Sequence, residues 1–277
     1  MPVKVIKPNH SGRRNMILHS FGEVTTSEPH KALLAFTKKR NGRNNQGMIT
    51  VRHRGGGSAR TCRILDFKQD KLEIPARVVS IEYDPYRSAR IALVAYNDGE
   101  KRYNIAPDQL QVGETVMSSK SRIEVKAGNR MPLEMIPEGS FVHNVELEPG
   151  KGGVLARSAG CSVQLLAIEG RFAHLRTPSK EVRKVLRNCM ATLGVVSNLD
   201  HHLTRVGKAG TSRHRGHRPA VRGKAMNPCD HPHGGGNGHC PIGLKFRKTL
   251  WGKPARGVHT RRTKKASTRM IFSRRTK

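Results

Sequence analysis

The positive charge of this 277-residue chain is concentrated at its two ends. Residues 1–60 hold 12 Lys and Arg against two acidic residues, and residues 201–277 hold 20 against one, so these segments carry net charges of +10 and +19. Residues 61–200 hold 20 basic and 17 acidic residues and are nearly neutral. Polycationic arms do not pack on themselves without a polyanion between them. The distribution therefore indicates a nucleic-acid partner.

The composition excludes several other classes of protein. The longest apolar stretches, such as Ile91–Tyr96 and Ser162–Ile168, are too short for a bilayer span, so we expect no membrane attachment. The N-terminal residues lack the apolar core of a signal peptide. The five cysteines are odd in number and irregularly spaced, which indicates a reducing compartment rather than a disulfide framework. We expect a soluble, intracellular protein.

The first arm, residues 1–60, alternates cations with glycine and asparagine. It contains Gly42-Arg43-Asn44-Asn45 and ends in Arg52-His53-Arg54-Gly55-Gly56-Gly57. Because glycine has no Cβ, consecutive glycines let the backbone approach a phosphate closely. A flexible basic linker is the alternative, but a linker does not need this density of charge. We interpret the segment as an extension that contacts nucleic acid.

Two sets of short strands are predicted in the middle of the chain. Val, Ile and Tyr are frequent in the first set, and Asn97–Glu100 is predicted to form a tight hairpin. Five such strands within residues 61–125 indicate a small barrel of the oligonucleotide-binding type. Residues 126–200 hold a second set, which indicates an SH3-like barrel. The expected strands are Cys62–Phe67, Ala76–Tyr83, Ala89–Tyr96, Arg102–Ala106 and Thr115–Met117, then Phe141–Leu147, Ser162–Ile168, Ala173–Arg176 and Glu181–Leu186.

The second arm, residues 201–277, is rich in Gly, Arg, His and Pro. One helical turn is predicted at His202–Lys208, and no periodic pattern follows it as far as Lys277. We expect this arm to be disordered in isolation and to fold along a partner surface. The predicted fold is therefore mainly β, with two small barrels flanked by extended basic arms.

Long motifs in one colinear order resemble a known family. They include Glu82–Ala89, Asp98–Tyr103, Pro149–Gly153, Leu155–Gly160, Arg213–Pro219, Val221–Pro228 and Asp230–Gly236. Together they closely resemble large ribosomal subunit protein two (the L-two family) of the bacterial type, over nearly the whole chain. The resemblance implies an oligonucleotide-binding-type barrel, an SH3-like barrel and two extensions threaded into large-subunit rRNA.

The same resemblance implies a function and its partners. The family is a structural constituent of the large ribosomal subunit and a primary rRNA-binding protein, which supports assembly, subunit association, tRNA binding and organisation of the peptidyl-transferase region. The implied partners are large-subunit rRNA of the 23S type, neighbouring ribosomal proteins and small-subunit rRNA across the subunit interface. A single copy per ribosome is implied, with no homo-oligomer. The location is a cytoplasmic ribosome, or an organellar one as the alternative.

By motif, the RNA-gripping arginines of the family fall on Arg87 and Arg157. Each lies just before Ser-Ala at the exposed edge of a predicted strand, where a guanidinium group can hold two phosphate oxygens or stack on a base. The alternative for Arg87 is a surface ion pair with a nearby acid such as Asp84. The other expected rRNA contacts are Arg43, Asn44, Arg52, His53, Arg54, Gly55, Gly56, Gly57, Lys151, Lys208, Arg213, Arg215, Arg218, Arg222, Asn227, His231, His233, Gly234, Gly235, Gly236, Arg261 and Arg262.

The loop around His231 allows a catalytic interpretation. The family's much-discussed histidine maps onto His231, and a neutral imidazole could serve as general base for aminolysis. Against this, the sequence offers no defined nucleophile, and Asp230 is the only acidic neighbour. RNA is understood to supply the peptidyl-transferase centre. We expect no catalytic residue, and expect His231 and His233 to bind rRNA. A histidine-based or metal-assisted transferase is the alternative class.

The same loop allows a metal interpretation. Cys229, His231, His233, His239 and Cys240 supply five potential zinc ligands within 12 residues. Their spacing matches no standard zinc finger, and the two cysteines depart from the family pattern. We expect a metal-free RNA loop and no cofactor beyond Mg²⁺ that accompanies rRNA. A third functional class, a general packager of nucleic acid, fits the charge but not the nearly neutral middle.

Overall fold

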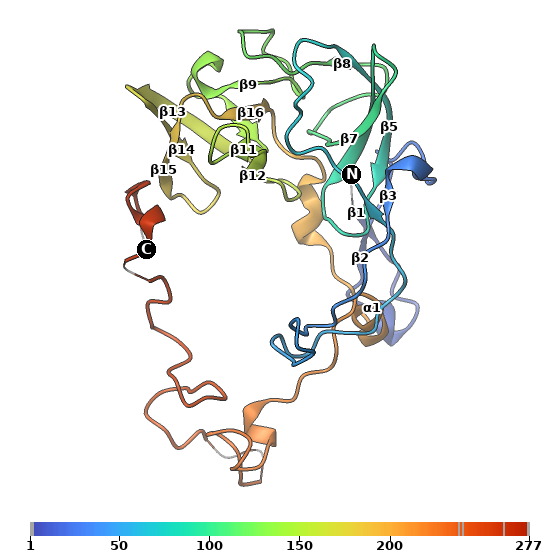
Figure 1. Ribbon diagram of the computed structural model, residues 1–277. Coiled ribbons are helices and arrows are strands. Elements are labelled where there is room, and N and C mark those ends of the chain that lie inside the picture. The colour runs from blue at the N-terminus through green and yellow to red at the C-terminus, as the bar shows by residue number, and fades with distance from the viewer. Residues whose placement is uncertain (1–2, 238, 240, 263, 276–277) are drawn as a thin grey trace. The chain divides into compact units, whose positions relative to one another are not determined.

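The computed structural model describes residues 3–237, 239, 241–262 and 264–275. This described part is mainly β, as predicted, and contains one short α-helix (Figure 1). The chain forms two compact units. The first contains the described residues up to Lys38, Ala59–Ala209 and those from Arg269 onward, and the second contains Lys39–Ser58 and Gly210–Thr268. Both predicted barrels belong to the first unit.

The first barrel is built on a curled, four-stranded antiparallel sheet in the order β7-β6-β5-β8. Its strands are β5 (Ala76–Tyr83), β6 (Arg90–Tyr96), β7 (Lys101–Ile105) and β8 (Thr115–Val116). β6 lies inside the sheet and is buried along almost its whole length, which explains its nearly unbroken apolar sequence. The predicted hairpin is confirmed, because the Tyr96 N–H donates to the Glu100 carbonyl at 2.9 Å.

The second barrel is built on a seven-stranded antiparallel sheet in the order β17-β15-β14-β13-β10-β16-β9. Its strands are β9 (Arg130–Pro132), β10 (Phe141–His143), β13 (Val163–Glu169), β14 (Phe172–Arg176), β15 (Val182–Leu186), β16 (Met190–Leu193) and β17 (Ile271–Ser273). A separate pair is formed by β11 (Val145–Glu146) and β12 (Gly153–Leu155). The strand predicted at Phe141–Leu147 is thus divided into β10 and β11.

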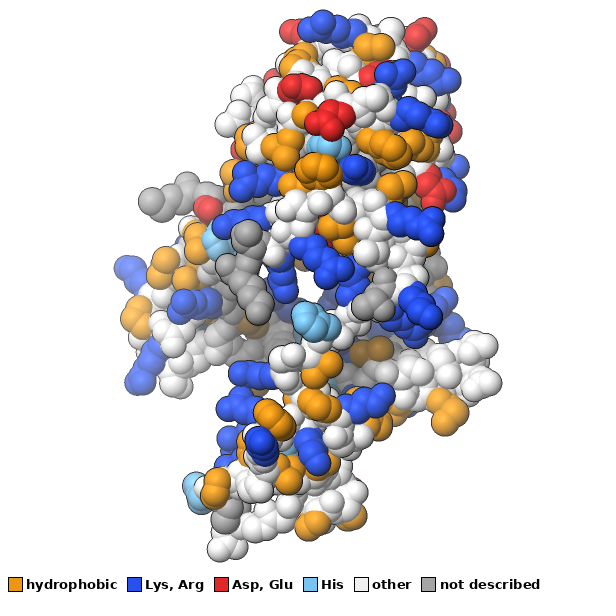
Figure 2. Space-filling view, turned by 90° about the vertical axis from the view of Figure 1, so that its left-hand side faces the viewer, with side chains coloured by type: hydrophobic (Ala, Val, Ile, Leu, Met, Phe, Trp, Pro, Cys, Tyr) orange, Lys and Arg blue, Asp and Glu red, His pale blue; other side chains and the backbone are white. Residues whose placement is uncertain are grey.

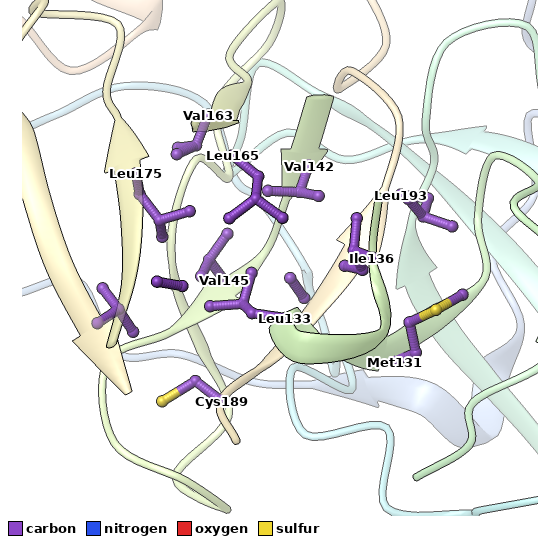
Figure 3. Close-up of a cluster of buried hydrophobic side chains, with 13 residues drawn as sticks. Met131, Leu133, Ile136, Val142, Val145, Val163, Leu165, Leu175, Cys189 and Leu193 are labelled. Carbon is purple, nitrogen blue, oxygen red and sulfur yellow. The ribbon is translucent and has the colours of Figure 1, made fainter. Parts of the chain in front are cut away.

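Apolar side chains fill the interior of the second barrel. They come from its strands and from a 3₁₀ turn, η3 (Leu133–Met135), and converge on one cluster (Figure 3). Leu133, Val142, Val145, Leu165 and Leu175 are completely buried. Full burial of such a side chain contributes about 1.5–3 kcal/mol, so these small strands hold together mainly through this cluster.

One buried ion pair crosses the same barrel. The Arg130 guanidinium donates from Nη2 to Glu146 Oε1 at 3.0 Å, and from Nη1 to Thr192 Oγ1 at 3.2 Å. The second oxygen of Glu146 accepts the N–H groups of Gly150 and Met190 at 3.1 and 3.2 Å. The pair therefore joins β9, β11 and β16 away from water.

The sequence patterns missed several elements. β9, β12 and β16 were not predicted, because they are short and lie in or beside glycine- and proline-rich sequence. The prediction of no ordered pattern up to Lys277 is wrong at β17, which pairs with β15 through Val182 and Ser273. The helical turn predicted at His202–Lys208 is also wrong. Only its first two residues are helical, as the end of the 3₁₀ helix η4 (Leu199–Leu203), and the helix α1 (Ala209–His214) begins after its last residue.

Part of the first arm packs on the first barrel. β1 (Val3–Val5) pairs with β2 (Ile17–His19), and β3 (Leu34–Ala35) pairs with β4 (Cys62–Arg63). Two further 3₁₀ turns are η1 (Ser11–Arg13) and η2 (Lys31–Leu33). The Tyr103 hydroxyl accepts the His30 N–H at 2.8 Å, which anchors the arm to β7.

The second unit lacks a comparable interior. None of its described residues is fully buried. Its regular elements are α1 from Gly210 on and the 3₁₀ turns η5 (Gly223–Ala225) and η6 (Ala266–Thr268). Among the described residues of the whole chain, no helix has the length and apolarity needed to cross a bilayer. The four described cysteines, Cys62, Cys161, Cys189 and Cys229, are free thiols.

Candidate nucleic-acid interface

Arg87 and Arg157 lie on two loops that are joined directly. Arg87 follows β5 in the turn to β6, and Arg157 follows β12 in the loop to β13. The Ala159 N–H donates to Ser88 Oγ at 3.1 Å, so the two Arg-Ser-Ala segments lie side by side. The Asn198 side chain donates from Nδ2 to the Ser88 carbonyl at 2.7 Å and fixes the same turn. The sequence identified both arginines but not their proximity.

The two guanidinium groups share one aromatic ring. The Phe67 ring centroid lies 4.5 Å from the Arg157 guanidinium carbon and 5.4 Å from that of Arg87. Both distances are within the range of cation–π attraction. These three side chains, with Tyr86, Ser88 and Ser158, line a pocket of about 480 Å³, which we call the arginine pocket. Sequence analysis missed Phe67, because it counted that residue only as the end of a strand.

Asp84 holds Arg87 in place. Its buried carboxylate accepts the Arg87 Nε–H at 2.7 Å and the Tyr86 N–H at 2.9 Å. The ion pair that sequence analysis weighed against RNA contact is therefore present. It occupies one of the five N–H donors of the guanidinium group, and the two terminal nitrogens carry the other four. The ion pair thus orients the Arg87 guanidinium group and leaves its four terminal N–H donors for other partners.

The expected exposure of these arginines is wrong. Both are half-buried in loops rather than exposed at strand edges. Arg157 donates from Nη1 to the Gly153 carbonyl at 3.2 Å, and Gly153 N–H donates to the Phe67 carbonyl at 2.8 Å. By contrast, Lys151 is 69% exposed and pairs with Glu148 one turn away. The arginine pocket is therefore preorganised, whereas Lys151 is an exposed surface cation.

The glycine-rich end of the first arm lies against the second arm. The Gly55 N–H donates to the Gly216 carbonyl at 3.1 Å, and the Ser58 N–H to the His214 carbonyl at 2.9 Å. Gly57 has φ +83°, and a Cβ there would lie 2.8 Å from the His214 carbonyl oxygen. We expected the glycine backbone to lie close to a phosphate. At Gly57 it lies close to the protein backbone instead.

Side chains of this segment also bind within the protein. His53 Nδ1 lies 3.0 Å from the Pro219 carbonyl, and Arg54 Nη1 lies 2.8 Å from His217 Nδ1. Arg52 Nη2 lies 3.5 Å from His53 Nε2. Arg52, His53 and Arg54 remain exposed, so these contacts position cations at the surface.

A compact turn presents Arg43. Asn44 Oδ1 accepts the N–H groups of Gln46 and Met48, both at 3.0 Å, and closes the turn. Arg43 pairs with Ile49 through an isolated β-bridge, and its side chain is exposed. Asn44 is therefore engaged in shaping the turn, and Arg43 is the cation that the turn displays.

The loop 226–235 is closed by its own backbone. The Asn227 carbonyl accepts the Asp230 N–H at 3.0 Å, and the Gly235 N–H donates to the Met226 carbonyl at 2.9 Å. A Cβ at Gly234 would lie 2.2 Å from the Asn227 carbonyl oxygen, so only glycine fits there. We expected the glycines to allow close approach of RNA. At Gly234, glycine is required first by the packing of the loop itself.

The hydrogen bonds of His231 and His233 define their tautomers. His231 Nδ1 accepts the His233 N–H at 3.0 Å, and His233 Nε2 accepts the Lys248 N–H at 2.9 Å. A neutral imidazole has one acceptor and one donor nitrogen, so neutral His231 carries its proton on Nε2. Burial, followed by the charges of His231, Lys248 and Arg247, lowers the pKa of His233. Nε2 of neutral His231 is therefore a donor and not a base.

The described residues form no ligand set for the metal site considered as an alternative. Among the described residues, no group of three or more His, Cys, Asp or Glu side chains could hold a metal ion. The acceptor nitrogens of His231 and His233 already bind backbone N–H groups. Cys229 and His239 are exposed, and Cys240 lies outside the described residues.

The other predicted cations lie in the second arm. Over the barrels, acidic and basic side chains are interspersed, whereas over the arms Lys and Arg are visible almost without acidic side chains (Figure 2). Arg213 and Arg261 are half-buried, and Arg261 donates from Nη2 to Ser267 Oγ at 3.0 Å. The exposed predicted contacts of this arm are Lys208, Arg215, Arg218, Arg222, Asn227, Gly236 and Arg262.

Comparison with known protein families gives two matches. Residues 30–118 match the family described as "Ribosomal Proteins L2, RNA binding N-terminal domain". Residues 126–252 match the family described as "Ribosomal Proteins L2, C-terminal domain". The first match contains the first barrel and much of the first arm. The second contains strands β9–β16 of the second barrel and the loop that carries His231.

Proposed function

The chain belongs to the ribosomal protein L2 family and is an RNA-binding structural protein of the large ribosomal subunit, and we propose that it is a primary binder of 23S-type rRNA. The two-barrel fold that the family resemblance implied is confirmed. In the proposed role, the protein supports large-subunit assembly, subunit association, tRNA binding and organisation of the peptidyl-transferase region. It acts as a single copy beside neighbouring ribosomal proteins and reaches small-subunit rRNA. We place it in a cytoplasmic ribosome, with an organellar ribosome as the alternative.

The arginine pocket is the observation that carries this proposal. Two guanidinium groups are held against Phe67 at 4.5 and 5.4 Å, and Asp84 orients one of them. Planar forks held in this way suit phosphate oxygens and base faces at fixed separation. Because the protein alone builds this geometry, the pocket recognises the shape of a folded RNA rather than its charge.

The arms supply affinity of a different kind. Residues 201–277 have 20 basic side chains and one acidic side chain, and their described part contains no fully buried residue. Such a segment gains free energy by displacing counterions from phosphates, which makes binding strongly dependent on salt. We propose that both arms follow rRNA in this way.

The geometry of His231 supports a structural role in the same complex. Neutral His231 presents an Nε2–H donor, since Nδ1 accepts the His233 N–H. A general base needs a free lone pair aimed at the proton that it removes. We propose that His231 donates a hydrogen bond to rRNA and that the peptidyl-transferase chemistry belongs to RNA.

Crosslinking in whole ribosomes tests the proposal. Photoreactive groups introduced at Arg87, at Arg157 and at His231 would each be mapped to nucleotides. We expect crosslinks from Arg87 and Arg157 to reach the same rRNA region, because the two side chains line one pocket. Crosslinks from these two positions to distant rRNA regions, or to protein alone, would contradict the proposed grip.

Binding selectivity separates this role from that of a general packager. The full chain should prefer folded large-subunit rRNA to duplex DNA at physiological salt, because the arginine pocket is shaped in advance. Equal affinity for the two would favour the packager.

A further inference from the structure

A row of aromatic rings lies where the first arm meets the first barrel. His201 stacks on His19 with centroids 5.0 Å apart and planes at 9°. The ring of Phe21 meets His19 edge-on at 5.9 Å and Tyr83 edge-on at 5.5 Å. We call His19, Phe21, Tyr83 and His201 the aromatic row. Its members come from β2, the loop after β2, β5 and η4, so only the fold brings them together.

The row is not a buried core. Phe21 is 45% exposed and Tyr83 is 43% exposed. Phe21 also has φ +54°, a left-handed conformation that is unfavourable for a bulky side chain. Backbone strain of this kind persists only where the surroundings enforce it, and it concentrates at functional positions. The structure thus holds an aromatic ring at the surface in a conformation that glycine or asparagine would adopt more easily.

A buried cation supports the row from the barrel side. Arg90 is 3% exposed, and its guanidinium carbon lies 4.8 Å from the Phe21 centroid and 6.0 Å from that of Tyr83. Arg90 Nε is buried without a hydrogen-bond partner, and the nearest carboxylate, Glu23, lies 3.8 Å away. Because the Arg90 guanidinium is shielded from water, its cation–π attraction holds the Phe21 ring in place. The exposed part of the ring then faces outward.

The loop that carries Phe21 is anchored to β5. The Thr25 N–H donates to the Ile81 carbonyl at 2.9 Å, and Thr25 Oγ1 accepts the Ile81 N–H at 2.9 Å. Thr26 continues this pairing through a bridge to Glu82. A platform anchored at both ends loses little conformational entropy when a ligand stacks on it.

The surroundings of the row are basic. Ile17 of β2 pairs with Arg205, and the Lys208 side chain lies against Gly12 of η1. Arg13 and Arg14 follow Gly12, and Lys4 of β1 is the register partner of Leu18, the residue before His19. Rings interleaved with cations are typical of surfaces that bind unpaired nucleotides, because bases stack on the rings while phosphates meet the cations.

We propose that the aromatic row stacks unpaired bases of the rRNA, with Phe21 as the principal platform. This inference rests on the proposed function, but it concerns a surface separate from the arginine pocket and from the His231 loop. Stacking differs from phosphate contact in one measurable way. It contributes affinity without counterion release, so its loss lowers the affinity and leaves the salt dependence unchanged.

The test uses the full-length protein and a transcript of large-subunit rRNA, with affinity measured at several salt concentrations. Phe21→Gly removes the ring and suits φ +54°, so folding is retained. We expect a loss of affinity of roughly 5- to 150-fold with an unchanged slope of log K against log salt. Phe21→Tyr should restore parental affinity. Phe141→Leu, which removes an exposed ring of the second barrel, is the matched control and should bind normally.

Ultraviolet crosslinking of the parental complex gives an independent readout of location. A nucleotide attached to a peptide that contains Phe21 or Tyr83 is the expected product. Parental affinity of Phe21→Gly, or crosslinks that avoid both peptides, would overturn the stacking proposal while rRNA binding by the parent stands. Failure of the parent itself to bind the transcript would instead contradict the proposed function.

Discussion

Basic side chains have different partners in the barrels and in the arms. In the first barrel, Arg102 pairs with Asp66 at 2.6 Å, with Glu100 at 2.7 Å and with Asp70. In the arms, Asp230 is the only acidic residue after position 200, and Arg54 contacts the imidazole of His217 instead of a carboxylate. The barrels balance their charge internally, whereas the arms leave it to be balanced by another molecule.

This difference shows how one chain combines geometry with affinity. The barrels bury apolar clusters and an ion pair, so they form a defined shape whose pocket is ready before RNA arrives. The second unit has no fully buried described residue, so its conformation depends far more on what it binds. Substitutions should therefore affect folding in one region and RNA affinity in the other.

The largest effect is expected from breaking the buried ion pair of the second barrel. Arg130→Met leaves the Glu146 carboxylate buried without its cation, and we expect a loss of about 3–5 kcal/mol in the free energy of unfolding. Urea unfolding of the full chain, followed by circular dichroism, measures it. Arg187→Met is the control, because Arg187 is 51% exposed and pairs with Glu134 at the surface. Its expected cost is below about 1 kcal/mol. Equal costs for the two variants would contradict the assignment of Arg130 as a buried support.

The second effect is a dependence of barrel stability on pH. Burial, with the nearby Arg130 charge, lowers the pKa of the completely buried His143 from 6.5 to about 4. The unfolded chain therefore binds this proton at higher pH than the native protein. Stability contributed by neutral His143 is present above pH 6.5 and is lost as the pH falls toward 4, by about 3 kcal/mol in total. Urea midpoints between pH 7 and 4 check this, and His143→Gln should have a flatter profile. If the parent and His143→Gln had parallel profiles of urea midpoint against pH, a group other than His143 would account for the pH dependence.

The third effect concerns the arms and should appear in binding alone. Replacing Arg215, Arg218 and Arg222 together by Gln should reduce the slope of log K against log salt by roughly 2–3 units, at about 0.7–0.9 per phosphate contact. Barrel cations Lys101, Lys180 and Arg187, changed likewise, are the matched control and should alter the slope less. Substitution is preferred to deletion of residues 201–277, because β17 belongs to the sheet of the second barrel. An unchanged slope of log K against log salt would contradict the proposed electrostatic role of the second arm.

The fourth effect tests the arginine pocket, where geometry should matter more than charge. Arg157→Lys keeps the positive charge but loses the planar group that lies against Phe67. We expect rRNA affinity to fall by about 1–3 kcal/mol with little change in stability. Arg87→Lys should behave similarly and also loses the Nε–H bond to Asp84. Filter binding at constant salt measures both, and parental affinity in both variants would show that they are ordinary surface cations.

The smallest effect is expected on the chemistry of peptide-bond formation. His231→Gln should impair particle assembly. Correctly assembled mutant ribosomes should form peptide bonds within about tenfold of the normal rate, since loss of a general base costs about 10²–10⁴-fold. Gln keeps a hydrogen-bond donor but takes up no proton near neutral pH. Single-turnover peptidyl transfer on purified particles decides the matter. A hundredfold loss with an abolished pH dependence would make His231 catalytic.

Much of the interface was predictable because its chemistry is local. The family motifs marked Arg87 and Arg157 as candidates, and the charge of the arms marked their cations. Phe67 was not predictable as a site residue, since a phenylalanine at the end of a strand is usually a core residue. No sequence signal marked it: Phe67 ends the expected strand Cys62–Phe67, and only the structure shows that pairing stops after β4 (Cys62–Arg63). The aromatic row carries no such signal either, because Phe21 and Tyr83 are 62 positions apart.

The sequence by itself determined which regions bury apolar surface and which carry uncompensated charge, because hydrophobic periodicity and charge density are properties of neighbouring residues. It therefore predicted two β barrels, their hairpin at Asn97–Glu100 and two polycationic arms. Only the tertiary structure decided that Ile271–Ser273 completes the second sheet, that Gly57 passes the backbone near His214, and that two arginines share Phe67. These contacts join residues far apart in the chain, and their stability depends on packing that no local pattern records.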